Sequence, residues 1–193
     1  MSTKSALPEG QLYIPPSVIG HPKLFSAEGI QNDPTSKPRF GCQIYLKKTD
    51  EATKAKIDAD IARLTKLHLK GVKPKSKDLF ISDGDGEDGD AHTVGCWIIS
   101  ANRAEKQGRP DIRKRENGAN VILDSAEASE IYGGAVCDFI ISTFIPKNWG
   151  SKICACLETV RKVKNGDRIG AARVDADEAM PDLPDEDEDG GFE

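Results

Sequence analysis

Residues 39–70 read RFGCQIYLKKTDEATKAKIDADIARLTKLHLK, in which a strand pattern passes directly into a helix pattern. The segment 39–46 is rich in the apolar and aromatic residues that favour strands. In the helix pattern, Ile57, Ile61 and Leu64 follow one another at a spacing of three or four and form one apolar stripe. Acidic residues open this pattern, lysines close it and Gly71 follows, so we expect one helix over about residues 50–70.

Short strand patterns surround this helix. They begin at 78–81 and continue at 92–101, 119–123, 134–145 and 152–163. We expect a further irregular or edge strand within residues 1–37, where Pro15 and Pro16 interrupt an apolar patch. Many short strands with one helix between the second and the third predict a mainly β fold, a small antiparallel barrel or sandwich rather than an α/β sheet.

The length and composition suit one domain and a tail. The chain has 193 residues, of which 37% are hydrophobic, and we assign 1–173 to a folded domain and 174–193 to a disordered acidic C-terminal tail. The N-terminus is polar and no apolar run could span a bilayer, so we expect a cytoplasmic protein that does not bind membranes. The five cysteines lie in apolar strand patterns and should be reduced structural residues.

The tail divides the chain into two electrostatic parts. Residues 174–193 hold ten carboxylates and no Lys or Arg, whereas the whole chain has 27 basic and 32 acidic side chains. Residues 1–173 therefore carry 27 positive against 22 negative charges, a net of +5. A basic body with an acidic tether predicts a protein that binds a polyanion and carries its own competitor for that site.

Basic residues occur beside aromatic ones in several segments. They follow the strand pattern of Trp97, flank Trp149 and accumulate in the last strand pattern. Aromatic rings beside a cationic groove hold single-stranded nucleic acid without reading its sequence. The candidate DNA-binding residues are Trp149, Trp97, Tyr132, Phe80, Lys73, Lys75, Arg103, Arg109, Arg113, Lys114, Arg115, Lys147, Lys152 and Arg161. An ordinary solvated face with both Trp side chains in the core is the alternative; the tail favours binding, because a polyanion needs a cationic surface to act on.

The acidic loop 83–90 offers a second function. Its alternating carboxylates resemble a calcium loop, and clustered acids also hold Mg²⁺ in nucleases, so a metal-dependent nuclease is an alternative. Counted from Asp83, however, the positions that need Gly and Glu in a calcium loop hold Asp88 and Val94. The sequence contains none of the common catalytic motifs, and we expect no catalytic residue, metal or cofactor.

A series of segments follows in a characteristic order. It runs from the strand 40–48 and the helix through DGD at 83–85, GCWIISA at 95–101, RP at 109–110, IYGG at 131–134, LETV at 157–160 and NGDRIG at 165–170 to the acidic tail. Over residues 38–193 this series resembles the single-stranded DNA-binding proteins of bacteriophages, of the T-odd replication type. The resemblance implies an OB fold, a five-stranded Greek-key barrel with one inserted α-helix.

The resemblance also implies a function. A chain of this kind would coat single-stranded DNA with little sequence preference during phage replication and recombination, in the cytoplasm of an infected bacterial host. The resemblance implies that the tail docks a replicative polymerase, helicase or primase, and from its charge we expect the tail to occupy the DNA groove until DNA displaces it. The docking residues would be Asp185, Glu186, Asp187, Glu188, Asp189 and Phe192. Tails of this kind usually end on the aromatic residue, whereas Glu193 follows Phe192 here.

Two further questions stay open at the level of sequence. The chain could instead be a protein-interaction adaptor or a DNA mimic that works through its acidic tail alone. A homodimer is also compatible with the sequence.

Overall fold

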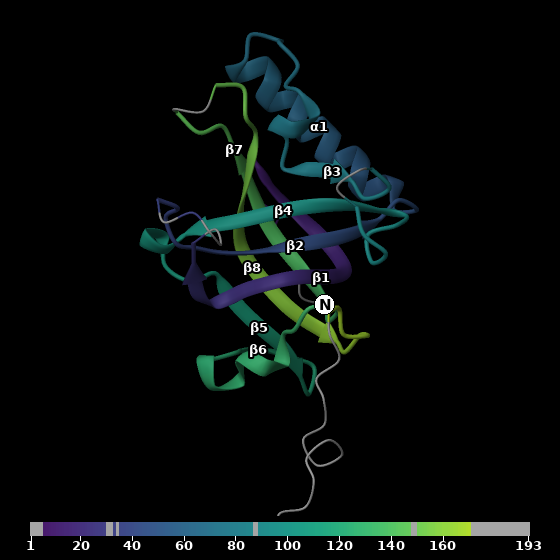
Figure 1. Ribbon diagram of the computed structural model, residues 1–193, viewed down its shortest axis with the longest axis vertical. Helices are drawn as coiled ribbons and strands as arrows, with labels where there is room; N and C mark the ends of the chain where they lie inside the picture. Colours follow the sequence, from purple (N-terminus) through teal and green to yellow (C-terminus); the bar gives the residue numbers. More distant parts are fainter. Residues whose placement is uncertain (1–5, 30–32, 34, 87–88, 148–149, 171–193) are drawn as a thin grey trace, which may run out of the picture.

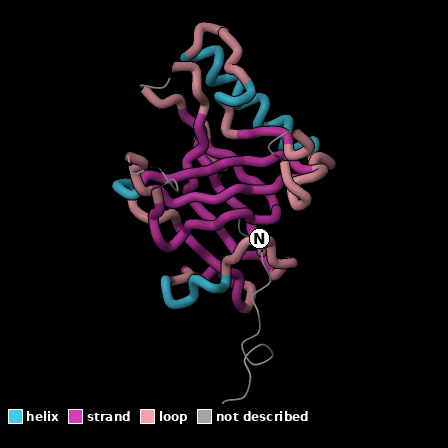
Figure 2. Tube along the Cα trace, viewed as in Figure 1, coloured by secondary structure: helices cyan, strands magenta, loops and turns pink. Residues whose placement is uncertain are grey.

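The chain forms a mainly β structure with one main helix (Figures 1 and 2). The computed structural model describes residues 6–29, 33, 35–86, 89–147 and 150–170. The strands are β1 (Gln11–Glu28), β2 (Arg39–Lys47), β3 (Ile81–Asp83), β4 (Cys96–Ala104), β5 (Asp111–Glu116), β6 (Ala119–Ile122), β7 (Val136–Phe144) and β8 (Cys154–Lys164). The helix α1 spans Glu51–His68, and three short 3₁₀ turns are η1 (Ser76–Asp78), η2 (Glu105–Gln107) and η3 (Ser125–Glu130). No described helix is long and apolar enough to cross a membrane.

Five strands close into a barrel in the order β4-β2-β1-β7-β8, which confirms the predicted fold. The seam is the pairing of β4 with β8, at Ala101 and Ala155, and these two strands run parallel. A closed ring with an odd number of strands cannot alternate in direction at every neighbour, so one parallel pair is required. The small antiparallel barrel expected from the strand patterns is therefore a mixed barrel, in which β4 and β8 pair parallel. A second parallel pair, β5 with β8, carries the β5–β6 hairpin at the end of the molecule away from α1 (Figure 1).

Strand β1 is irregular, as one of the two predicted alternatives had it, but it lies inside the sheet and not at its edge. Its first part, 11–18, pairs with β7 and its second part, 18–28, pairs with β2. The two prolines that argued against a central strand lie where the register shifts between Ile14 and Ser17, so the ladder has no bond there for proline to remove. A second shift follows Gly20, where His21 has a φ of 44° and the strand bends.

Helix α1 agrees with its prediction. The Asp50 carboxylate accepts a hydrogen bond from the Thr53 backbone N–H at 3.0 Å and caps the first turn. Ile57 and Leu64 are 0% and 4% exposed, so the apolar stripe packs on the barrel. In Figure 1 the helix lies beside β3 at one end of the barrel, opposite the β5–β6 hairpin.

The remaining differences from prediction concern short strands. β4 begins at Cys96 rather than residue 92, because 91–95 form turns. β5 has the sequence DIRKRE, in which only Ile112 is apolar, and it was not predicted. The sequence feature that indicates this strand is the turn after it, where Asn117 and Gly118 have φ values of 48° and 82°. Asn-Gly is the residue pair that a two-residue hairpin turn with positive φ favours.

Candidate nucleic-acid interface

A groove crosses the outer face of the barrel from β1 over β2 and β4 to the start of β8. It consists of two adjoining hollows of about 460 and 370 Å³ that share Lys37, Arg39, Ser100 and Asn102. The cations that line it are Lys23, Lys37, Arg39, Lys77 and Lys152. Its one described carboxylate is Glu28, which lies 3.0 Å from the Lys23 ammonium. The groove is therefore a cationic surface that few carboxylates neutralise.

The pairing of β2 with β4 builds the floor of this groove. Arg39, Gly41 and Gln43 lie opposite Ala104, Asn102 and Ser100 in register, and all six face outward. The alternate residues of β2, such as Ile44 at 0% exposure, face the core. A Cβ atom on Gly41 would lie 2.4 Å from the Asn102 Oδ1, so glycine keeps the floor open at this point.

An aromatic edge borders the groove. Phe144 lines it and is 44% exposed, which leaves a ring face available to a base. Phe80 also lines it but is only 5% exposed and belongs to the core, so its ring supports the floor. Lys152 lines the same hollow, and Trp149 lies outside the described residues.

Several predicted DNA-binding cations are engaged in ion pairs elsewhere. The pairs are Arg103 with Glu158 at 2.5 Å, Arg113 with Asp111 at 2.7 Å, Lys114 with Glu127 at 2.5 Å, and Arg161 with Asp138. Asp138 is 4% exposed, and its hydrogen bonds with Arg161 raise the pKa of that guanidinium. For Glu158, burial raises the pKa, but hydrogen bonds from Ser142 and Arg103 outweigh it and the pKa is lowered. These cations bind carboxylates of their own fold and lie outside the groove lining.

The other predicted cations are scattered. Arg109 lies over the Phe25 ring, 5.3 Å from its centroid, and Arg115 is exposed on β5. Lys73 and Lys75 are exposed between α1 and η1. Lys147 is exposed near the end of α1, in a hollow that adjoins the groove through Phe144 and Pro146.

Two predicted stacking residues have partners within the fold. The Trp97 ring lies under two ammonium groups, Lys48 at 4.9 Å and Lys54 at 4.6 Å from its centroid. The Tyr132 ring lies under the Arg168 guanidinium at 4.1 Å. Neither ring lines the groove. Base stacking on them stays a prediction.

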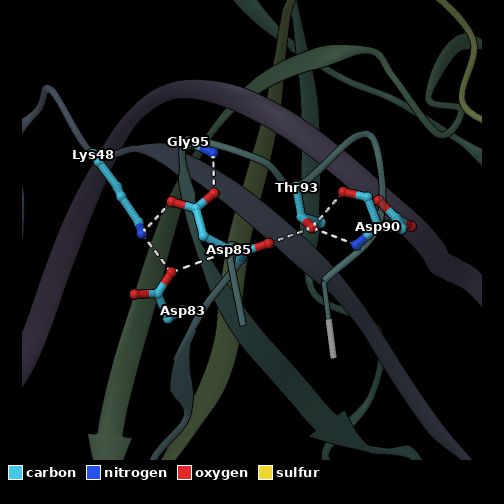
Figure 3. A network of polar contacts seen from close by, with 7 residues as sticks. Lys48, Asp83, Asp85, Asp90, Thr93 and Gly95 are labelled. Carbon is cyan, nitrogen blue, oxygen red and sulfur yellow. Dashed lines mark hydrogen bonds and ion pairs between the residues drawn. The ribbon is translucent and has the colours of Figure 1, made fainter. Parts of the chain in front are cut away.

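The acidic loop uses its described carboxylates to fix its own shape (Figure 3). Lys48 binds both Asp83 and Asp85, and Asp85 also accepts the Gly95 backbone N–H at 2.6 Å. Buried Thr93 donates a hydrogen bond to the Gly84 carbonyl at 3.1 Å. Hydrogen bonds from Lys48 lower the pKa of both aspartates. Within the described ranges, which omit 87–88, no three His, Cys, Asp or Glu side chains could hold a metal ion.

Some groove residues were missed in the sequence. Lys37 and Arg39 flank Pro38, Lys77 ends a lysine-rich segment, and Phe144 lies in an apolar strand pattern. Clusters of cations along the chain do not reveal this surface, because the fold assembles it across strands. The one available signal was the alternation in β2, which places Arg39 on the outward face.

A small closed barrel with a cationic, aromatic-edged groove defines a protein that binds single-stranded nucleic acid. The chain belongs to the family described as "Enterobacter phage Enc34, ssDNA-binding protein", whose family model matches residues 18–191. This confirms the predicted resemblance and makes the chain a phage single-stranded DNA-binding protein of a non-enzymatic family. The nuclease alternative is therefore rejected.

Solved structures agree with this assignment. The bacteriophage Enc34 single-stranded DNA-binding protein in complex with ssDNA has 27% identity and a TM-score of 0.72, over 83% of this chain and 90% of that one. A second structure of the bacteriophage Enc34 single-stranded DNA-binding protein has 28% identity and a TM-score of 0.68, over 88% of this chain and 89% of that one. Bacteriophage T7 gp2.5, a single-stranded DNA-binding protein, shares the fold at 12% identity and a TM-score of 0.54, over 95% and 98%. No curated protein matches the chain.

Proposed function

We propose that this chain coats single-stranded DNA with little sequence preference and that the strand lies in the groove across β1, β2 and β4. The observation that carries the proposal is the groove lining, in which cations from four separate segments face one open surface. The Enc34 protein, whose structure is described in complex with ssDNA, supports DNA as the ligand.

The chemistry follows from the lining. Lys37, Arg39, Lys77 and Lys152 would each neutralise a backbone phosphate, and the released counterions make binding weaken with salt. Four such contacts give a slope of about −2.8 in a plot of log affinity against log salt. Phe144 would add base stacking, which tolerates every base. Neither interaction reads base edges, so the sequence preference should be weak.

We propose further that the acidic tail competes with DNA for this groove. Ten carboxylates in 174–193 match a cationic groove as well as a run of phosphates does. DNA would displace the tail, and the released tail would dock a replicative polymerase, helicase or primase through 185–189 and Phe192. The tail lies outside the described residues. A homodimer stays a prediction.

Titration of a labelled thymidine oligonucleotide with the full chain at several salt concentrations tests the location of the site. The variant Arg39→Ala/Lys77→Ala should bind at least about tenfold more weakly at low salt and lower the salt slope by about 1.4. The matched control is Lys56→Ala/Lys66→Ala, which removes the same charge from exposed positions of α1. Equal losses in the two variants would show that only net charge matters and would contradict this site.

A further inference from the structure

We propose that the acidic tail lies in the groove with a fixed polarity, entering at the β1 end and running toward the start of β8. This inference rests on the proposed competition between tail and DNA and adds the direction of the competitor. It derives from the way the fold holds residues 165–170, the last described segment before the tail.

Tyr132 anchors this segment with its hydroxyl group. The hydroxyl donates a hydrogen bond to the Gly166 carbonyl at 2.9 Å and accepts one from the Gly166 backbone N–H at 3.2 Å. The Arg168 guanidinium covers the Tyr132 ring at 4.1 Å. One side chain of the 131–134 turn therefore holds two positions of the segment that leads into the tail.

The backbones of the two segments also approach closely. The Ile169 backbone N–H donates to the Gly133 carbonyl at 2.8 Å. A Cβ atom on Gly166 would lie 2.2 Å from the Gly134 carbonyl oxygen, so only glycine fits at this contact. The root of the tail is thus fixed to the barrel until Ile169.

This root lies at one end of the groove. A Cβ atom on Gly133 would lie 3.5 Å from the Ile169 carbonyl oxygen and 4.0 Å from the Pro22 ring, so both residues lie close to Gly133. Pro22 stands between His21 and Lys23, which both line the β1 end of the groove. The chain beyond Gly170 therefore starts near Pro22 at the β1 end of the groove, whereas Lys77 and Lys152 line the other hollow.

Chain dimensions then place the acids of the tail. Adjacent strands lie about 4.8 Å apart, so crossing from β1 over β2 to β4 takes about 10 Å, and the groove continues beyond β4 to Lys77 and Lys152. Asp175, Asp177 and Glu178 follow Gly170 by five to eight residues, which gives a mean reach of about 12–16 Å. The run 185–189 begins 15 residues after Gly170, with a mean reach of about 21 Å. A tail that runs along the groove therefore places the proximal acids closer to Lys23, and the distal run closer to Lys77 and Lys152.

Zero-length carbodiimide coupling of lysines to carboxylates, mapped by mass spectrometry on the dilute full chain, tests this polarity. We expect the acids 175–178 to be linked to Lys23, and the acids 185–189 to Lys77 or Lys152. A thymidine oligonucleotide should abolish both sets of links. A mixture of ¹⁴N and ¹⁵N protein shows whether the links form within one chain.

Other outcomes would overturn the polarity. The polarity would be wrong if the distal acids were linked to Lys23 while the proximal acids stayed free. It would also be wrong if links formed only to Lys114 or Lys162, outside the groove lining, only between two chains, or not at all. If the tail did not compete with DNA, the cross-linking result would differ. Links between the tail and the groove would then form and would persist when saturating oligonucleotide is bound. Failure of the DNA site is read separately, from the Arg39→Ala/Lys77→Ala titration.

Variants of the anchor provide a second test. Tyr132→Phe removes both hydrogen bonds to Gly166, and Gly166→Ala forces the two backbones apart. Freeing 165–170 lengthens the tether to the proximal acids about twofold, so their links to Lys23 should fall about twofold or more while distal links change less. Tyr13→Phe is the control, since it removes one hydroxyl hydrogen bond, to Asp138, outside the groove. A Tyr132→Phe map identical to that of the control would contradict an anchoring role.

Discussion

At the scale of the residue, Phe144 and Phe80 show how one chemical type takes two roles at the same groove. Phe144 exposes 44% of its surface, whereas Phe80 exposes 5% and packs in the core. A base gains stacking energy only from a ring it can reach. Both rings lie in apolar strand patterns, so the sequence could not distinguish the exposed ring from the buried one. Exposure depends on how the strands pack in the folded protein.

Phe144→Ala should weaken binding of a thymidine oligonucleotide by about 1–3 kcal/mol, because one stacking surface is lost. The salt slope should not change, since no phosphate contact is removed. Fluorescence anisotropy at three salt concentrations measures both quantities. Tyr13→Ala is the control, because Tyr13 is 45% exposed but lies outside the groove lining. Unchanged affinity in Phe144→Ala would remove this ring from the interface.

Three of the arginines that were predicted to bind DNA form ion pairs within the fold instead. Arg103, Arg113 and Arg161 were chosen because they are frequent in basic segments, yet each binds a carboxylate that is distant in sequence or on its own strand. A sequence gives the number of cations but not their partners. Arg39, which was not among the predicted DNA-binding residues, lines the groove instead.

At the scale of the element, the acidic loop depends on Lys48 at the end of β2. Lys48→Met should raise the pKa of Asp83 and Asp85 toward the ordinary value of 3.8, because the hydrogen bonds that lower both are lost. A lowered carboxyl pKa stabilises the fold above pH 3.8 and ceases to do so as the pH falls through the folded pKa. The wild type should therefore exceed the variant in stability near neutral pH, and the difference should vanish in acid.

Carboxyl carbon NMR titration measures these pKa values, and thermal unfolding from pH 2 to 7 measures the stability difference. Lys56→Met is the matched control, an exposed lysine of α1. Identical aspartate titrations in wild type and Lys48→Met would contradict the network of Figure 3.

The attachment of α1 to β7 depends on Asp60. This carboxylate is 8% exposed, accepts a hydrogen bond from Thr143 and binds Arg63 at 2.7 and 2.9 Å. Asp60→Ala should destabilise the protein by about 2–4 kcal/mol, because buried partners lose their acceptor. Asp58→Ala removes an exposed carboxylate from the same helix and should cost less than about 0.5 kcal/mol. Denaturant unfolding compares the two, and equal effects would argue against the buried network.

The elements also show how far sequence patterns reach. The strand 39–47 and α1 were predictable because apolar period and caps agree along one continuous segment. β5 was not, because its single apolar residue gives no alternation and its pairing with β8 is a tertiary interaction. The prolines of β1 misled the prediction for the same reason, since the bulge that accommodates them is defined by the partner strand.

At the scale of the whole molecule, charge couples the tail to the barrel. A chain truncated after Arg173 changes from a net charge of −5 to 27 positive against 22 negative charges, or +5. We expect it to bind single-stranded DNA about tenfold more tightly at low salt and with a steeper salt dependence, because a linked competitor is removed. Titration of both proteins measures this. Unchanged or weaker affinity would contradict competition, and loss of all DNA binding would favour an adaptor that acts through its tail.

The location of the DNA is tested most directly by photo-cross-linking of the full chain to a thymidine oligonucleotide that carries 5-iododeoxyuridine. Iodouracil couples to an aromatic ring that it stacks on, and mass spectrometry identifies the residue. We expect the adduct on Phe144, at the edge of the groove that Lys37, Arg39, Lys77 and Lys152 line, or on Trp149, a predicted stacking residue outside the described part of the chain. Adducts confined to Tyr13, outside that groove, would contradict a DNA path across β1, β2 and β4.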